Sequence, residues 1–103
     1  IQKTMPQDTH DEGLVQQYAK KIAPLAVLAL SGKDVHKEVD VVVTDAAAHF
    51  AVVAGSSEIG NLKRFSGTLR NMAESARESQ RLYGATFDYA RGQVEAMLEK
   101  KNT

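Results

Sequence analysis

The 103-residue sequence predicts an all-α domain of three or four helices. Apolar residues recur every three or four positions along most of the chain, and residues that start or stop helices separate the periodic segments. The apolar fraction of 43% and the charged fraction of 25% are typical of a folded globular chain, and the length fits one domain. We expect residues 1–8 to form a flexible lead-in and residues 9–103 to form a single helical domain.

The first helix is expected over residues 10–31. Thr9 and Glu12 form a capping-box pattern, in which each side chain bonds to the backbone N–H of the other residue. Pro24 lacks an N–H and crowds the preceding turn, so we expect the helix to break or kink there. Gly32 provides a C-terminal stop. The apolar positions at helical spacing are Leu14, Val15, Tyr18, Ile22 and Leu25.

The second element, residues 34–54, permits two interpretations. Its β-branched run from Val39 to Thr44 favours a strand, which would give an α+β fold with a short hairpin over 39–54. The periodicity favours a helix that begins after Asp34. In a helix the β-branched residues cost about 2 kcal/mol in total, and burial of the apolar face outweighs this cost, so we favour the helix. That face comprises Val35, Val39, Val42, Val43, Ala46, Phe50 and Val53.

The third segment, Ile59 to Lys101, follows a Gly-Ser-Ser turn and is amphipathic along its whole length. Its apolar residues are three or four positions apart, close to a heptad repeat, and form a row along one face that is called the seam below. Gly84 lies where this repeat is interrupted. Either one helix of about forty residues carries a stutter there, or two helices meet at Gly84.

This seam is longer than the two helices expected over residues 10–31 and 34–54 can cover. We therefore expect a homodimer in which the C-terminal segments of two chains pair. The corresponding function is non-enzymatic binding of another protein, as a small oligomeric adaptor, an assembly subunit or a regulator. The residues expected at the oligomer or partner interface are Leu62, Phe65, Leu69, Met72, Tyr83, Phe87, Val94 and Met97.

An alternative function, nucleic-acid binding, rests on basic residues of the same segment. Lys63, Arg70 and Arg77 recur every seven positions, although the 13 basic and 13 acidic residues of the chain cancel. Such a row can follow a phosphate backbone, and neighbouring aromatic rings can stack on unpaired bases. Glu74 and Glu78 each precede an arginine by three positions, so we expect them to neutralise part of the charge. The residues expected to contact nucleic acid are Lys63, Arg64, Arg70, Arg77 and Arg81.

No enzyme, metal site or cofactor site is expected. The segment from Gly55 to Leu62 has the position and glycine spacing of a phosphate-binding loop, but Asn61 and Leu62 replace the required Lys and Ser/Thr. A turn that caps a helix is the better interpretation. The pairs His36–Asp40 and Asp45–His49 face different sides of one helix, so their ligands cannot converge on a metal.

Two further classes are excluded by composition. The sequence contains no Cys, which excludes thiolate catalysis, Fe–S clusters and Cys-based zinc sites. No apolar run reaches the ~18 residues of a membrane span; the longest, Ile22 to Leu30, has about half that length. We therefore expect no membrane partner.

Overall fold

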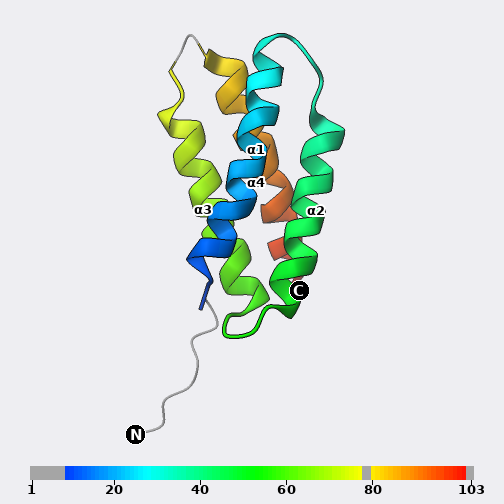
Figure 1. Ribbon diagram of the computed structural model, residues 1–103, viewed down its shortest axis with the longest axis vertical. Coiled ribbons are helices and arrows are strands. Elements are labelled where there is room, and N and C mark those ends of the chain that lie inside the picture. Colours follow the sequence, from blue (N-terminus) through cyan, green and yellow to red (C-terminus); the bar gives the residue numbers. More distant parts are fainter. Residues whose placement is uncertain (1–8, 78–79, 102–103) are drawn as a thin grey trace, which may run out of the picture.

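The computed structural model describes residues 9–77 and 80–101, so the predicted lead-in over residues 1–8 lies outside the described part. These described ranges form four helices and no strand. The chain runs up α1, down α2, up α3 and down α4, which makes α1 and α3 parallel (Figure 1). The helices are α1 (Glu12–Leu30), α2 (His36–Val52), α3 (Glu58–Ser75) and α4 (Arg81–Lys101).

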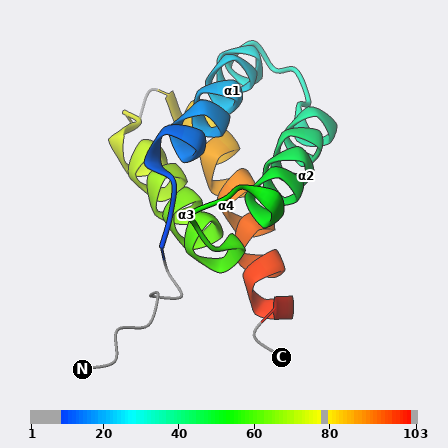
Figure 2. The same ribbon diagram turned by 60° about the horizontal axis from the view of Figure 1, so that its bottom comes forward.

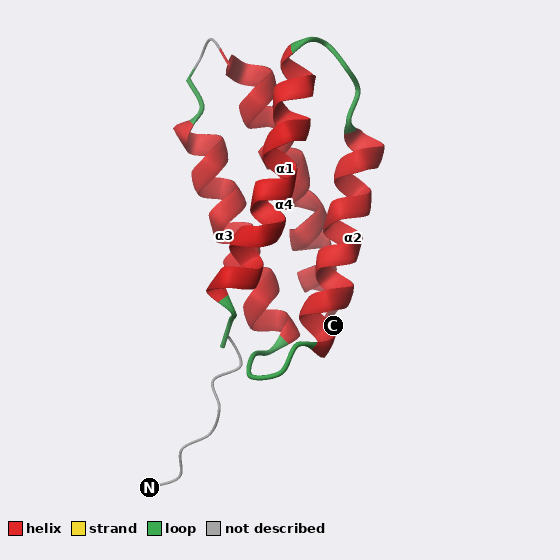
Figure 3. Ribbon diagram, viewed as in Figure 1, coloured by secondary structure: helices red, strands yellow, loops and turns green. Residues whose placement is uncertain are grey.

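The all-α prediction is confirmed, and the alternative hairpin over residues 39–54 is wrong. That segment is α2, as the colouring by secondary structure shows (Figure 3). One face of α2 is buried against the other helices through Val39, Val43, Ala46 and Phe50. Burial of this face outweighs the strand preference of the β-branched residues. Asp34 still acts at the start of the helix, where its carboxylate accepts a hydrogen bond from the His36 backbone N–H at 3.0 Å.

In α1, two details differ from the prediction. The N-cap is Asp11, whose carboxylate accepts from the Leu14 N–H at 3.1 Å, in place of the predicted cap at Thr9. The predicted break at Pro24 is absent, because α1 continues through this residue to Leu30. Pro24 lies on the exposed side of α1, where water can satisfy the carbonyl group that the missing N–H leaves without a partner.

The long third segment is two helices, but they do not meet at Gly84. The helix α3 ends at Ser75 and α4 begins at Arg81, so Gly84 lies in the first turn of α4. A Cβ atom on Gly84 would lie 3.0 Å from the Ala76 Cβ and 3.2 Å from the Ala73 carbonyl oxygen. Glycine is therefore needed here for the close approach of two helices rather than for a break.

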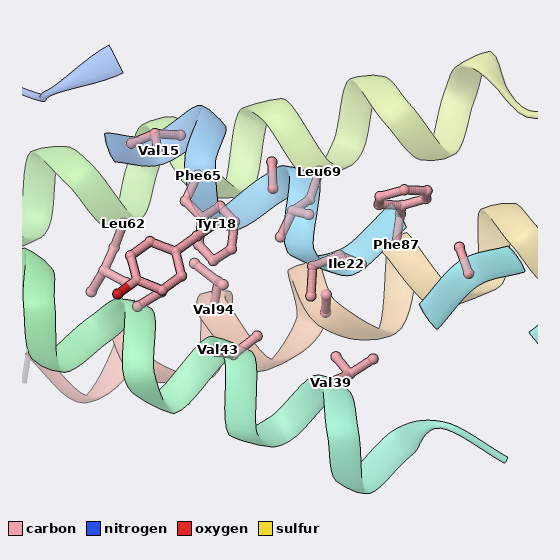
Figure 4. Close-up of a cluster of buried hydrophobic side chains, with 14 of the residues drawn as sticks. Val15, Tyr18, Ile22, Val39, Val43, Leu62, Phe65, Leu69, Phe87 and Val94 are labelled. Carbon is pink, nitrogen blue, oxygen red and sulfur yellow. The ribbon is translucent and has the colours of Figure 1, made fainter. Parts of the chain in front are cut away.

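The core lies between the four helices, each of which contributes to one cluster of buried side chains (Figure 4). Phe50 of α2 packs edge to face against Phe65 of α3 and against Tyr18 of α1, with ring centroids 5.6 Å and 5.7 Å apart. The helix α4 packs against each of the other three helices, and Figure 2 shows it running behind them. Burial of each large side chain contributes about 1.5–3 kcal/mol, so the cluster joins all four helices into one unit.

The contact at Gly84 gives a test of the α3–α4 packing. We expect Gly84→Ala to lower the free energy of unfolding by about 1 kcal/mol, because overpacking a rigid contact outweighs the gain in helix propensity. The matched control is Gly67→Ala in α3, whose added Cβ meets nothing within 4 Å. The control should raise this free energy by about 0.5–1 kcal/mol. Urea denaturation measures both, and equal stabilisation by the two variants would contradict the close packing.

Candidate functional site

Most residues of the predicted interface lie in the core of the chain itself. Leu62, Phe65, Leu69, Phe87 and Val94 are at most 1% exposed. The helices α3 and α4 run antiparallel and cover the seam between them with the help of α1 and α2. These five side chains cannot contact a partner while the domain is folded, so the seam no longer argues for a dimer. The homodimer stays a prediction, and its interface would have to use other surfaces.

The other three residues of that set are only partly buried. Met72, Tyr83 and Met97 pack against the edge of the core. Met72 and Tyr83 lie on the same side of the domain, where they line a groove together with Phe87. The predicted interface therefore divides into a buried majority and a pair of accessible side chains, Met72 and Tyr83, that belong to one concave surface.

This groove lies between α1 and α3 and has a volume of about 650 Å³. The two helices diverge towards the end of the bundle where they terminate, which is uppermost in Figure 1 and is called the upper end below. One wall carries Val27 and Leu30 of α1, and the other is formed by α3. Tyr83 and Phe87 of α4 contribute to the floor, with their rings 5.2 Å apart in an edge-to-face arrangement. The α3 wall comprises Thr68, Asn71, Met72 and Ser75.

Two exposed apolar side chains belong to the α1 wall of this groove. Val27 is 56% exposed and Leu30 is 40% exposed, and both belong to the groove wall. Leu28 of α1 and Leu82 of α4 are also exposed but do not line this groove, and Leu82 lines another hollow together with Ala29 and Val35. Single exposed apolar residues are common on protein surfaces, but neighbouring exposed apolar residues in a concave groove are typical of a binding surface.

At its lower end the groove is bounded by an ion pair. The Arg64 Nε lies 2.6 Å from a Glu12 carboxylate oxygen and joins α3 to the start of α1. The hydrogen bond from Arg64 holds the pKa of Glu12 below its usual value, and the same bond raises the pKa of Arg64. Arg64 lines the groove, yet its charge is balanced by this partner.

The other predicted nucleic-acid contacts do not form an unbroken basic stripe. Arg70 pairs with Glu74 at 3.3 Å, and Lys63 lines a separate hollow of about 610 Å³ together with Glu95 of α4. The predicted pair between Glu74 and Arg77 is wrong, because α3 ends at Ser75 and Arg77 does not continue the helix. The predicted pair between Glu78 and Arg81 is not described, because Glu78 lies outside the described residues.

Arg77 and Arg81 lie together where the chain passes from α3 to α4. Both line a second hollow together with Ala76, Gly84 and Asp88. Asp88 itself lies 3.8 Å from the Arg91 Nε. Among residues 9–77 and 80–101, no carboxylate forms an ion pair with either Arg77 or Arg81. Arg77, Arg81 and Lys63 are thus the exposed cations of the predicted set for which no ion pair is present within the described residues.

The segment that resembles a phosphate-binding loop is a structural junction. Ser57 caps α3 by accepting from the Gly60 N–H at 2.8 Å. The side chain of Asn61 is fully buried; it accepts from the Asp11 N–H at 2.7 Å and donates to the Ser56 hydroxyl at 2.9 Å. The segment thus joins the start of α1 to the start of α3. In the sequence, Asn61 was recognisable only as a replacement for the lysine of the motif.

His36 and Asp40 take part in a contact between α2 and α4. Asp40 accepts hydrogen bonds from the Tyr89 hydroxyl at 2.9 Å and from the Gln93 amide at 3.0 Å. The His36 ring stacks on the Tyr89 ring, with centroids 4.2 Å apart. The hydrogen bond to Asp40 raises the pKa of Tyr89, because deprotonation would place two negative charges side by side. The pair predicted from spacing therefore serves helix packing.

Asp45 and His49 are not joined by an ion pair. The Nδ1 atom of His49 lies 3.0 Å from the Tyr18 hydroxyl of α1, while Asp45 is exposed on α2. Within the described ranges there is no group of three or more His, Cys, Asp or Glu residues placed to hold a metal ion. The imidazoles of His36 and His49 each contact a tyrosine on another helix.

Comparisons with known proteins provide no further guide. No protein-family model matches the chain, and no curated protein or solved structure is significantly similar to it. In the part of the chain that the structure describes, no helix has the length and apolar character needed to cross a membrane.

The buried amide of Asn61 is open to a direct test. We expect Asn61→Ala to lower the free energy of unfolding by about 1–3 kcal/mol, because the Asp11 N–H loses its acceptor in a buried position. The control is Asn71→Ala, since Asn71 is exposed on the same helix. Urea denaturation gives the free energies of unfolding, and hydrogen exchange gives the protection of the Asp11 backbone amide. Unchanged protection of this amide in Asn61→Ala would contradict its assigned role.

The contact between Tyr89 and Asp40 predicts a pH dependence. Tyr89 should titrate above the usual value of about 10, and Asp40→Asn should lower its pKa. Above pH ~10 the unfolded chain loses a proton that folded Tyr89 retains, so this contribution to stability falls as pH rises through that window. NMR titration of the tyrosine rings measures the pKa. Asp45→Asn, on the same helix but away from Tyr89, should leave it unchanged, and an equal effect of both variants would refute the contact.

Proposed function

We propose that this protein is a non-enzymatic, helical protein–protein interaction module. Its partner-binding surface is the groove between α1 and α3, and the partner contributes an amphipathic helix. The observation that carries the proposal is an open groove of about 650 Å³ whose lining mixes polar and apolar side chains and includes two exposed apolar residues of α1, Val27 and Leu30. Contact of these apolar side chains with water is unfavourable. Docking of the apolar face of a helix removes them from water.

The geometry supports a helix as the occupant. The walls are two helices that diverge, and the floor belongs to α4. A helix placed there would pack against α1 and α3 in the same way that helices pack within the bundle. Between Arg64 and Ser75 the α3 wall rises about 16 Å, which matches three turns of a partner helix. Polar side chains at the rim, including Asn71 and Ser75, suit the border of such an interface.

The chemistry of the lining supports binding rather than catalysis. The groove is lined by hydroxyl groups of Thr68, Ser75 and Tyr83, but no histidine or carboxylate lies among the described lining residues. A hydroxyl nucleophile requires an adjacent base. His36 and His49 contact tyrosines elsewhere, at the α2–α4 and α1–α2 contacts.

A competition experiment tests the proposal. A displayed library of helix-forming peptides of about 16 residues is selected on the folded protein. We expect selected peptides to carry apolar residues at helical spacing, and Leu30→Glu to weaken their binding at least tenfold, about 1.4 kcal/mol. The control is Val41→Glu, at an exposed apolar position on α2 (59% exposed) that does not line the groove. Failure to select any peptide, or equal effects of the two variants, would contradict the proposal.

The alternative, nucleic-acid binding, has weaker support from the charges. Arg64 and Arg70 are paired with Glu12 and Glu74, so a phosphate backbone would have to displace these carboxylates. We expect no binding to single- or double-stranded oligonucleotides in a salt series measured by fluorescence anisotropy. Binding that weakens linearly with the logarithm of salt concentration would favour the alternative.

A further inference from the structure

We infer that the partner helix places a neutral amide side chain, that of Asn or Gln, in the lower half of the groove, between Thr68 of α3 and Gln16 of α1. This inference rests on the proposed function and defines the partner class more closely. The partner is an amphipathic helix whose apolar face is interrupted by one amide, and the hydrogen bonds of that amide set the position of the helix along the groove.

The hydroxyl of Thr68 is a polar group that lacks a partner. Thr68 is only 7% exposed and lines the groove, and within the described residues its hydroxyl forms no hydrogen bond. Thr86, a second buried threonine, donates at 3.0 Å to the carbonyl of Leu82, four residues earlier in the same helix. Thr68 does not make the corresponding bond, so its hydroxyl remains available to a ligand.

This hydroxyl is open to the groove rather than enclosed in the core. Among the residues that the structure describes, the fully enclosed side-chain nitrogen or oxygen without a hydrogen-bond partner is Arg91 Nε. The Thr68 hydroxyl is therefore not sealed, and water in the groove can reach it. A partner that covered the groove with apolar side chains alone would remove this water and leave the hydroxyl without a hydrogen bond, which is unfavourable. A partner that supplies a hydrogen bond at this position avoids this loss.

Gln16 lies on the opposite wall of the groove, level with Thr68. The helices α1 and α3 run parallel (Figure 1), and Glu12 and Arg64 join them at the lower end, 2.6 Å apart. Gln16 and Thr68 each follow a member of this ion pair by four residues, so both lie one turn, about 6 Å, above it. Both line the groove. The Gln16 Nε2 donates to Glu12 at 2.8 Å, while its Oε1 accepts no hydrogen bond within the described ranges.

An amide side chain matches these two groups. Its carbonyl oxygen accepts from the Thr68 hydroxyl, and its NH₂ group donates to the Gln16 Oε1. A carboxylate has no donor for Gln16, and an ammonium group would lie one turn from the guanidinium of Arg64. Because Glu12 already balances Arg64, a neutral side chain adds no uncompensated charge. A single polar contact inside an apolar interface fixes register and excludes partners that cannot form it.

The test removes one hydroxyl at a time. Thr68→Val keeps the shape of the side chain and removes the hydroxyl, whereas Thr68→Ser keeps the hydroxyl. The matched control is Thr86→Val, because Thr86 is also buried (6% exposed) but does not line the groove. Peptides selected from the helix-forming library on the unmodified protein are measured against all three variants by fluorescence anisotropy, and circular dichroism confirms that each variant is folded.

We expect the selected peptides to carry one Asn or Gln among the apolar positions of the face that enters the groove. Thr68→Val should weaken their binding at least fivefold, about 1 kcal/mol, and Thr68→Ser and Thr86→Val less than twofold. Replacement of the peptide amide by Leu should weaken binding to the unmodified protein at least fivefold and binding to Thr68→Val less than twofold. A merely structural role of Thr68 would not produce this difference.

A second variant covers the case in which Thr68→Val fails to fold. The amide peptide and its Leu derivative are then compared on Gln16→Leu, which removes the acceptor on the opposite wall. The control is Gln17→Leu, at an exposed position of α1 that does not line the groove. The preference for the amide peptide should fall at least threefold in Gln16→Leu and stay unchanged in Gln17→Leu.

The outcomes separate the inference from the proposed function. If peptides are selected without an amide on this face, or if Thr68→Val and Thr86→Val bind them equally, the inference is overturned while groove binding stands. If no peptide is selected, or if Leu30→Glu binds as well as the unmodified protein, the proposed function fails as well. Light scattering behind a sizing column adds one arm: a mass twice that of the chain, abolished by Leu30→Glu, would show that a second copy occupies the groove and would overturn the inferred partner.

Discussion

Where α4 passes the end of α3, the backbone of Gly84 lies so close to α3 that a Cβ atom there would be 3.0 Å from the Ala76 Cβ. Glycine at this position permits the close approach of the antiparallel helices α3 and α4. Because α4 also packs against α1 and α2, its position determines the core. It also determines the groove, since Tyr83 and Phe87 of α4 form part of the floor.

The two ends of the bundle differ in how their polar groups are used. At the lower end, Asn61 and the pair of Glu12 with Arg64 join α1 to α3. At the upper end no comparable contact between these two helices is present among the described residues, and the helices diverge (Figure 1). The groove lies at this end, where Val27 and Leu30 of α1 line it and remain exposed. The lower end is thus joined by polar contacts between α1 and α3, and the upper end presents exposed apolar side chains.

The periodicity of the sequence predicted which faces are apolar, and that is sufficient for the fold class. Val39 and Phe50 of α2, and Leu62 and Phe65 of α3, are buried as the helical spacing indicates. Periodicity does not say whether the same chain or a second one covers a face. That depends on where the chain turns, and residues 76–80 contain neither Gly nor Pro to mark the turn. The groove was not predictable for a similar reason, because it arises from the divergence of two helices that are distant in sequence.

The central claim is that a partner helix occupies the groove between α1 and α3. Chemical-shift mapping by NMR, with a selected peptide added to ¹⁵N-labelled protein, tests it most directly. The account predicts shifts concentrated on Val27, Leu30, Met72 and Tyr83, with little change along the exposed face of α2. Shifts centred on α2, around Val41 and Val52, would contradict it.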